Sequence, residues 1–286
     1  MSEESQLIAT AIESLQQTPN FFKDYIFPIA SAFFTSILGA VIAYFTLRHQ
    51  EGIQIEKEKM NTSNKWTINI DQARSSLIAI KGNYNGKLTA LPLERLSEVP
   101  CIMFDARVIP DDFHELSFIV VQKSDLKPEL PKWSQIPRIR AMVCNYNYLL
   151  KLWEQRNEIN QKFQTKILDS IGGEAYGDFT HESIEKIVGK GELALIIDFT
   201  ERCISLTDDL IIEFDSFLLD FPSYAKTRIN CKRLKKYGTI LNYSNNSNEA
   251  LLKLLKKSPP ADFSSLEDLF GDTNENIKKK YKTGYE

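Results

Sequence analysis

Acidic and imidazole side chains gather in one short stretch, where Asp111, Asp112, His114 and Glu115 lie close together. Such an oxygen-rich set could bind a hard metal cation. The same residue types are typical of a helix start, where they cap free N–H groups and complement the helix dipole. We predict the second arrangement, a short helix over residues 111–122, and no metal site.

The cysteines do not form a metal-binding or disulfide pattern. Cys101, Cys144, Cys203 and Cys231 are far apart and include no C-x-x-C pair, and the chain has only three histidines. Structural zinc requires closely spaced Cys or His pairs. Scattered thiols of this kind are typical of reduced, core-filling cysteines in a cytosolic domain.

Two glycine-rich stretches could suggest a nucleotide loop, but neither has the necessary pattern. Gly172, Gly173 and Gly177 form one stretch, and Gly189 and Gly191 form the other. Both lack the P-loop spacing and its terminal Lys-Ser/Thr pair. They are better explained as loop and helix-end glycines, and we predict no cofactor.

Six residues separate Arg107 from His114. This spacing resembles the Arg-x(4–6)-His motif of HEPN-type ribonucleases, which are helical and occur in bacterial defence systems. The resemblance implies that the two side chains serve a composite RNA-cleaving site formed by a dimer. The sequence departs from the pattern at Val108, where a polar residue is usual, and at Pro110, which interrupts the expected helix. A surface arginine and a loop histidine are the simpler interpretation.

Four carboxylates share a predicted helix with a stripe of phenylalanines: Asp208, Asp209, Glu213 and Asp215. We expect most of them on a solvated face. One of them could instead pair with Arg156 across a helical hairpin, in a buried polar layer.

Six basic residues follow Pro222 closely: Lys226, Arg228, Lys232, Arg233, Lys235 and Lys236. If this segment folds back toward a bilayer, it could bind anionic lipid headgroups. Residues 249–257, EALLKLLKK, could lie at the same interface as an amphipathic helix. The alternative for both is a solvated charged face with ordinary packing.

Residues 25–47 read YIFPIASAFFTSILGAVIAYFTL and contain no charged residue. A helix needs roughly 20 apolar residues to cross a hydrocarbon core of about 30 Å. Tyr25 and Tyr44 lie near the two ends, where such rings favour the interface. The preceding segment is acidic, unlike the basic start of a signal peptide. We therefore predict a transmembrane helix over 25–47.

Basic residues predict the orientation of this span. Only Lys23 precedes it, whereas Arg48, Lys57, Lys59 and Lys65 follow it. The positive-inside rule then leaves residues 1–24 as a short extracytoplasmic tail and places the remainder in the cytoplasm, on a single-pass protein of the cell (inner) membrane.

Small residues recur along the predicted span in two series. Such stripes allow close approach of helix backbones and favour a homo-oligomer. The residues are Ala32, Ser36, Gly39, Ala40 and Ala43.

The rest of the chain is predicted to be mainly α-helical. Residues 48–65 read as a helical stalk, followed by a cytosolic helical bundle over 66–243 and a flexible tail with short helices over 244–286. Within the bundle, an apolar stripe begins at Trp66 and ends near Tyr84. Two further stripes, starting near Met142 and Ile196, predict a long antiparallel hairpin. Short helices are expected at 93–99 and 111–122; Phe118–Val121 could alternatively be a buried strand.

Composition gives no reason to expect nucleic acid as the main partner, because the formal net charge is −3. The layout of a short tail, one span and a helical body resembles single-span membrane effectors of retron and abortive-infection phage-defence systems. That resemblance implies membrane perturbation after infection is sensed. We therefore expect a non-enzymatic effector or signalling protein whose partners are the lipid bilayer, further copies of itself and an unknown cytosolic protein. The alternatives are a passive tether or scaffold and a membrane-tethered HEPN-like ribonuclease.

Overall fold

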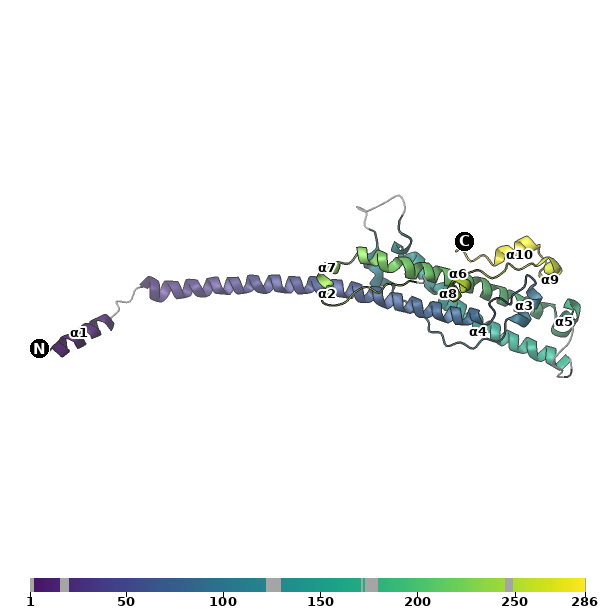
Figure 1. Cartoon of the computed structure of the whole chain (residues 1–286), viewed down its shortest axis with the longest axis horizontal. Helices are drawn as coiled ribbons and strands as arrows, with labels where there is room; N and C mark the ends of the chain where they lie inside the picture. The colour runs from purple at the N-terminus through teal and green to yellow at the C-terminus, as the bar shows by residue number, and fades with distance from the viewer. Residues whose placement is uncertain are drawn as a thin grey trace. The chain divides into compact units, whose positions relative to one another are not determined.

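The computed structural model describes residues 3–15, 21–121, 130–170, 172, 180–244 and 249–285. These residues are mainly helical, and no strand occurs among them (Figure 1). The chain divides into two compact units, Met1–Ile55 and Glu56–Glu286. Helix α2, Phe27–Gly82, contributes residues to both units, so the expected stalk is also divided between them.

The first unit contains α1, Glu3–Leu15, a π-helical turn η1, Phe22–Ile26, and the beginning of α2. Large apolar side chains in this part of α2 are exposed; Phe33, Phe34 and Leu38 each show at least 60% of their surface. Burying apolar surface is a main source of folding free energy. These side chains therefore gain little of it within one copy of the chain.

The second unit takes its first core stripe from α2. The predicted stripe is confirmed, because each of its members is at most 2% exposed: Trp66, Ile70, Ala73, Leu77, Ile80 and Tyr84. The helix ends at Gly82, and a turn follows in which Gly86 has a φ of 77°. Glycine adopts this left-handed conformation without a Cβ clash.

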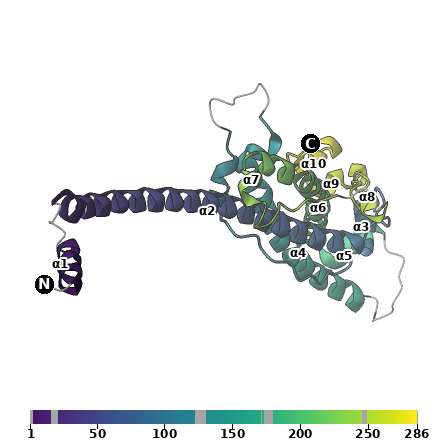
Figure 2. The same cartoon turned by 60° about the vertical axis from the view of Figure 1, so that its left-hand side comes forward.

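Helix α4, Ile136–Ser170, packs along α6, Lys190–Thr227 (Figures 1 and 2). The rings of Tyr146 and Phe214 lie 5.5 Å apart, and Trp153 Nε1 donates to Thr207 Oγ1 at 3.0 Å. Because numbers fall along α6 as they rise along α4, the helices run in opposite directions. Pro222 lies inside α6, which continues to Thr227.

Short elements connect and cover the long helices. The expected helix near residues 93–99 is present as α3, Pro92–Glu98, whereas Phe113–Ile119 forms a 3-10 helix, η2, in place of an α-helix or strand. A 3-10 turn η4 covers Lys132–Ser134. Helix α5, His181–Val188, lies where only a connection was expected. Of the glycines assigned to that connection, Gly173 and Gly177 fall outside the described residues.

The C-terminal region contains α7, Cys231–Leu234, α8, Glu249–Leu254, η5, Ser264–Leu266, α9, Glu267–Phe270, and α10, Asn274–Lys280. Short helices were expected in this region, and the one expected within residues 249–257 is present as α8. A flexible tail, however, is not what residues 249–285 form. Phe263, Leu266 and Ile277 are at most 1% exposed and pack in one cluster with Ile196 of α6.

Candidate functional sites

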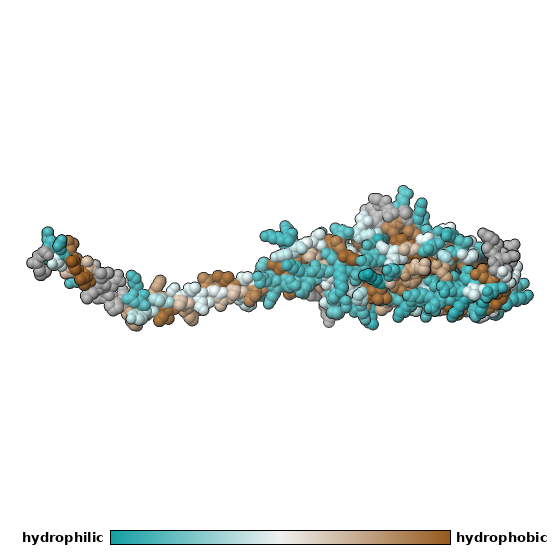
Figure 3. Space-filling view, turned by 90° about the horizontal axis from the view of Figure 1, so that it is seen from below, coloured by the Kyte–Doolittle hydropathy of each residue, from teal (hydrophilic) through white to brown (hydrophobic). Residues whose placement is uncertain are grey.

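The first candidate site is the apolar beginning of the helix that runs through α2. It is long and apolar enough to cross a membrane, with a mean hydropathy of 2.1 over its most apolar window, none of which is buried. Figure 3 shows brown and white residues along this part of the chain, in contrast to the largely teal face of the second unit. The small residues predicted to mediate association are all exposed, and a Cβ at Gly39 would meet nothing within 4 Å.

The second candidate site is the basic segment, residues 226–236. Arg228 differs from the other predicted members because its guanidinium is used internally: Nε donates to Tyr224 Oη at 3.2 Å, and the group lies over the Tyr224 ring. The remaining five are exposed: Lys226, Lys232, Arg233, Lys235 and Lys236.

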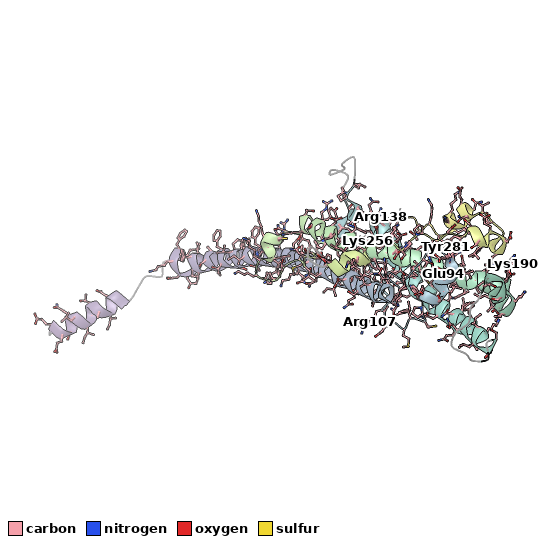
Figure 4. All side chains as sticks on the ribbon, turned by 45° about the vertical axis from the view of Figure 1, so that its right-hand side comes forward. Glu94, Arg107, Arg138, Lys190, Lys256 and Tyr281 are labelled. Atoms are coloured by element: carbon pink, nitrogen blue, oxygen red, sulfur yellow. The ribbon has the colours of Figure 1, made fainter. Side chains whose placement is uncertain are left out.

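Arg107 and His114 lie on different segments. Arg107 is exposed on the extended stretch before η2, at an edge of the second unit in Figure 4, and its carbonyl accepts from Tyr146 Oη at 3.1 Å. His114 is exposed on η2. A hollow of about 630 Å³ is lined by Arg107 and Tyr146 but not by His114. Among the described residues, no hydrogen bond or ion pair joins the side chains of Arg107 and His114.

The acidic residues before η2 serve a different purpose from the predicted cap. Asp112 occupies the N-cap position without a side-chain capping bond. It accepts instead from Lys65 Nζ at 3.0 Å, and Glu115 accepts from the same ammonium at 3.1 Å. Two carboxylates thus bind the side chain of Lys65, the last residue of the expected stalk. No metal-binding group of three His, Cys, Asp or Glu occurs among the described residues.

A line of buried ion pairs joins α6 to α2 and α3. Glu201, Asp208 and Asp215 recur every seven residues, which places them on one helical face. Asp215 pairs with Arg74 at 2.8 Å and Asp208 with Lys81 at 2.7 Å, both on α2. Glu201 pairs with Arg95 of α3 at 2.7 Å.

The other two carboxylates predicted to be solvated, Glu213 and Asp209, are also buried and paired. Glu213 accepts from Lys132 at 2.8 Å and from Arg138 at 2.9 Å, and Asp209 pairs with Lys257. The predicted solvated face is therefore wrong. Basic side chains from other segments pair with these carboxylates, and this pairing offsets the free-energy cost of removing the charges from water.

Arg156 does not pair with any of the four carboxylates proposed as its partners, Asp208, Asp209, Glu213 and Asp215. Its guanidinium donates to the carbonyls of Val99 at 2.6 Å and Pro100 at 2.7 Å, and to Thr200 Oγ1 at 3.2 Å. Burial lowers the pKa of Arg156 to about 10. Arg156 therefore does not form the expected carboxylate pair. Its buried guanidinium instead joins Val99 and Pro100, which follow α3, to α4 and α6.

The cations of the ion-pair line also hold the C-terminal strap, residues 256–262. Lys81 Nζ donates to the carbonyl of Lys256 at 2.6 Å, and Arg95 Nη2 donates to that of Pro259 at 2.5 Å. The Ser258 amide donates to Asp208 at 2.5 Å. Figure 4 labels Lys256, the first residue of the strap, and Tyr281, which directly follows α10.

A cavity of about 270 Å³ lies between the strap and α6, lined by Glu201, Asp208, Phe263 and Tyr281 among others. Glu201 is 3% exposed, and its Oε1 has no hydrogen-bond partner. Burial raises the pKa of Glu201 to about 7, although the Arg95 guanidinium acts in the opposite direction. The cavity therefore contains a carboxyl group that titrates near neutral pH.

The ion-pair line was not predicted from the sequence, although a matching residue spacing is present there. Arg74 and Lys81 share the seven-residue spacing of their partners Asp215 and Asp208. The strap's contacts have no comparable signal in the sequence.

Comparisons of the chain with protein-family models, curated proteins and solved structures found no match in any of the three.

Proposed function

We propose that this chain is a single-pass membrane protein, with a non-enzymatic effector or signalling domain that senses a cytosolic partner. The observation that carries the proposal is the uncharged, exposed helical stretch over residues 25–47. Lipid would cover these apolar side chains, and their removal from water would stabilise the inserted helix. The helix satisfies its own backbone hydrogen bonds within the bilayer.

Basic residues support an orientation with the second unit in the cytoplasm. One basic residue, Lys23, precedes the span, and four follow it before residue 66. The second unit then acts as a helical bundle built around the antiparallel pair α4 and α6. Its buried ion pairs favour one defined packing of α2 against α6, which is useful in a domain that must report partner binding.

Self-association of the span is the proposed route to membrane perturbation, as in the phage-defence effectors that the layout resembles. The small side chains at Ala32, Ser36 and Ala40 and at Gly39 and Ala43 would let two backbones approach closely. Larger residues at these positions would separate the helices without a clash inside one copy, since Gly39 faces open space.

Anchoring is tested by extraction of bacterial membranes at high pH and by a reporter fused to each terminus. Retention in the membrane with a cytoplasmic C-terminus is expected. Release into the soluble fraction would refute the anchor.

Effector action is tested by recording membrane potential and growth for the intact chain and for Ser36→Leu/Gly39→Leu at equal membrane abundance. Ile37→Leu/Val41→Leu is the matched control, because it changes residues outside the small-residue series. Depolarisation that only the first variant loses would support the proposal. An unchanged potential with the intact chain and its partner present would favour a passive tether.

A further inference from the structure

We infer that the basic segment, residues 226–236, binds anionic phospholipid headgroups of the membrane in which residues 25–47 are anchored. This inference rests on the proposed anchoring and names the lipid that the second unit recognises. Phosphate-bearing headgroups attract basic clusters near a membrane, and each cation adds to the attraction.

The cations of this segment are available to a ligand. Lys226, Lys232, Arg233, Lys235 and Lys236 are exposed, and none forms an ion pair with a described residue. In contrast, other basic residues of the second unit, such as Lys65, Arg74 and Lys81, are committed to carboxylates. Four lysines without a described ion pair thus lie between residues 226 and 236, in a chain whose net charge is −3. The fifth cation, Arg233, acts electrostatically on the Glu56 carboxylate and helps to lower its pKa.

The fold places this segment on the first turns of the second unit. Ile229, Leu234 and Ile240 bury their side chains against Met60 of α2. The Asn230 amide donates to Glu56 at 2.6 Å. The basic segment is therefore docked on residues that follow the proposed span closely, although more than 160 residues separate Asn230 from Met60 in sequence.

Further contacts fix the residues directly after the segment, 238–241, on α2. Asn64 uses both ends of its amide: Nδ2 donates to the Thr239 carbonyl at 3.1 Å, and Oδ1 accepts from the Leu241 amide at 2.9 Å. Gly238 has a φ of 146°, and a Cβ there would lie 3.2 Å from Met60 Cε. Glycine thus permits both the backbone conformation and the close approach.

The length of chain between Leu47 and Glu56 keeps this surface near the bilayer. Eight residues lie between the two positions, so even a fully extended chain would span only about 32 Å from Leu47 to Glu56. Binding to the membrane surface is then an intramolecular event with a high effective concentration. A soluble polyanion would have no such advantage, and so we assign the site to lipid.

Lysine acylation of the intact chain tests the inference. The chain is reconstituted into nanodiscs of neutral lipid or of neutral lipid with anionic phosphatidylglycerol, and modification of each lysine is measured by mass spectrometry. Lys232, Lys235 and Lys236 should react about three-fold or more slowly in the anionic discs. Exposed Lys151 and Lys162 of α4 supply the internal reference. High salt should remove the protection, because the Debye length falls to about 3 Å at 1 M.

A charge-removal variant tests the cause. In Lys232→Gln/Lys235→Gln/Lys236→Gln, the protection of Lys226 should be lost, whereas Lys151→Gln/Lys162→Gln/Lys190→Gln should retain it. Equal reactivity in the two kinds of disc, or protection that salt leaves unchanged, overturns the inference while the anchor stands. Failure of the intact chain to enter either disc overturns the anchor and the inference with it.

Discussion

Replacement of Glu201 by Gln should remove the pH dependence of stability that this buried carboxyl creates. Two effects oppose each other at Glu201: burial raises its pKa, and Arg95 at 2.7 Å lowers it. Burial is the larger of the two effects, so the pKa is about 7 rather than its ordinary 4.5. A glutamine resembles the protonated form and does not titrate.

The magnitude follows from the size of this shift. The folded protein holds the Glu201 proton over a pH range in which the unfolded chain has already lost it. Stability from this proton is therefore fully present below pH 4.5 and is lost as the pH rises through about 7. At about 1.4 kcal/mol for each pKa unit, the loss is on the order of 3 kcal/mol. The free energy of unfolding of Glu201→Gln relative to the natural chain should rise by this amount between pH 4.5 and pH 8.

Tryptophan fluorescence during urea unfolding of the detergent-solubilised chain provides the assay. All three tryptophans, Trp66, Trp133 and Trp153, are at most 1% exposed in the second unit, so they report its unfolding. Glu94→Gln, which removes an exposed carboxylate from the helix that carries Arg95, is the control. A stability difference that does not change with pH, or that falls toward pH 8, would show that the ion pair outweighs burial and would refute the reasoning.

Three further substitutions probe the buried polar groups by the same unfolding assay. Asp208→Asn leaves Lys81 buried without its counter-charge and should destabilise the second unit by about 3 kcal/mol; a loss below about 1 kcal/mol would contradict a buried pair. Arg156→Lys replaces a planar group that reaches two carbonyls and should cost about 2 kcal/mol, because at least one carbonyl loses its partner. Trp153→Phe removes the indole bond to Thr207 and should cost about 1–2 kcal/mol, with no effect on membrane retention.

The sequence by itself determined the long helices of the second unit and their apolar faces, although not α5 or the 3-10 conformation of η2. The stripe from Trp66 to Tyr84 and the long stripe of α6 are buried as their spacing predicts, because a 3.6-residue period can place apolar residues on one side only as a helix. It also determined that residues 25–47 are uncharged and long enough to cross a membrane, since this depends on composition alone.

The burial of charge was decided by the tertiary structure. Asp208 and Asp215 look like members of a solvated face, since a carboxylate is normally left in water. Their partners Lys81 and Arg74 lie more than 120 residues away in sequence. Local patterns cannot reveal such pairing, because the free energy that permits burial comes from the partner and not from the helix that carries the acid.

Packing of the C-terminal region and of the basic segment was likewise decided only by the fold. Polar composition after residue 244 suggested a flexible tail, yet Arg95 and Lys81 bind the carbonyls of the strap, and Phe263 enters the core. The basic segment could be recognised from its lysines, but its position on α2 depends on Met60 and Asn64. Charge can be counted from a sequence, whereas the surface to which that charge is attached depends on contacts between distant residues.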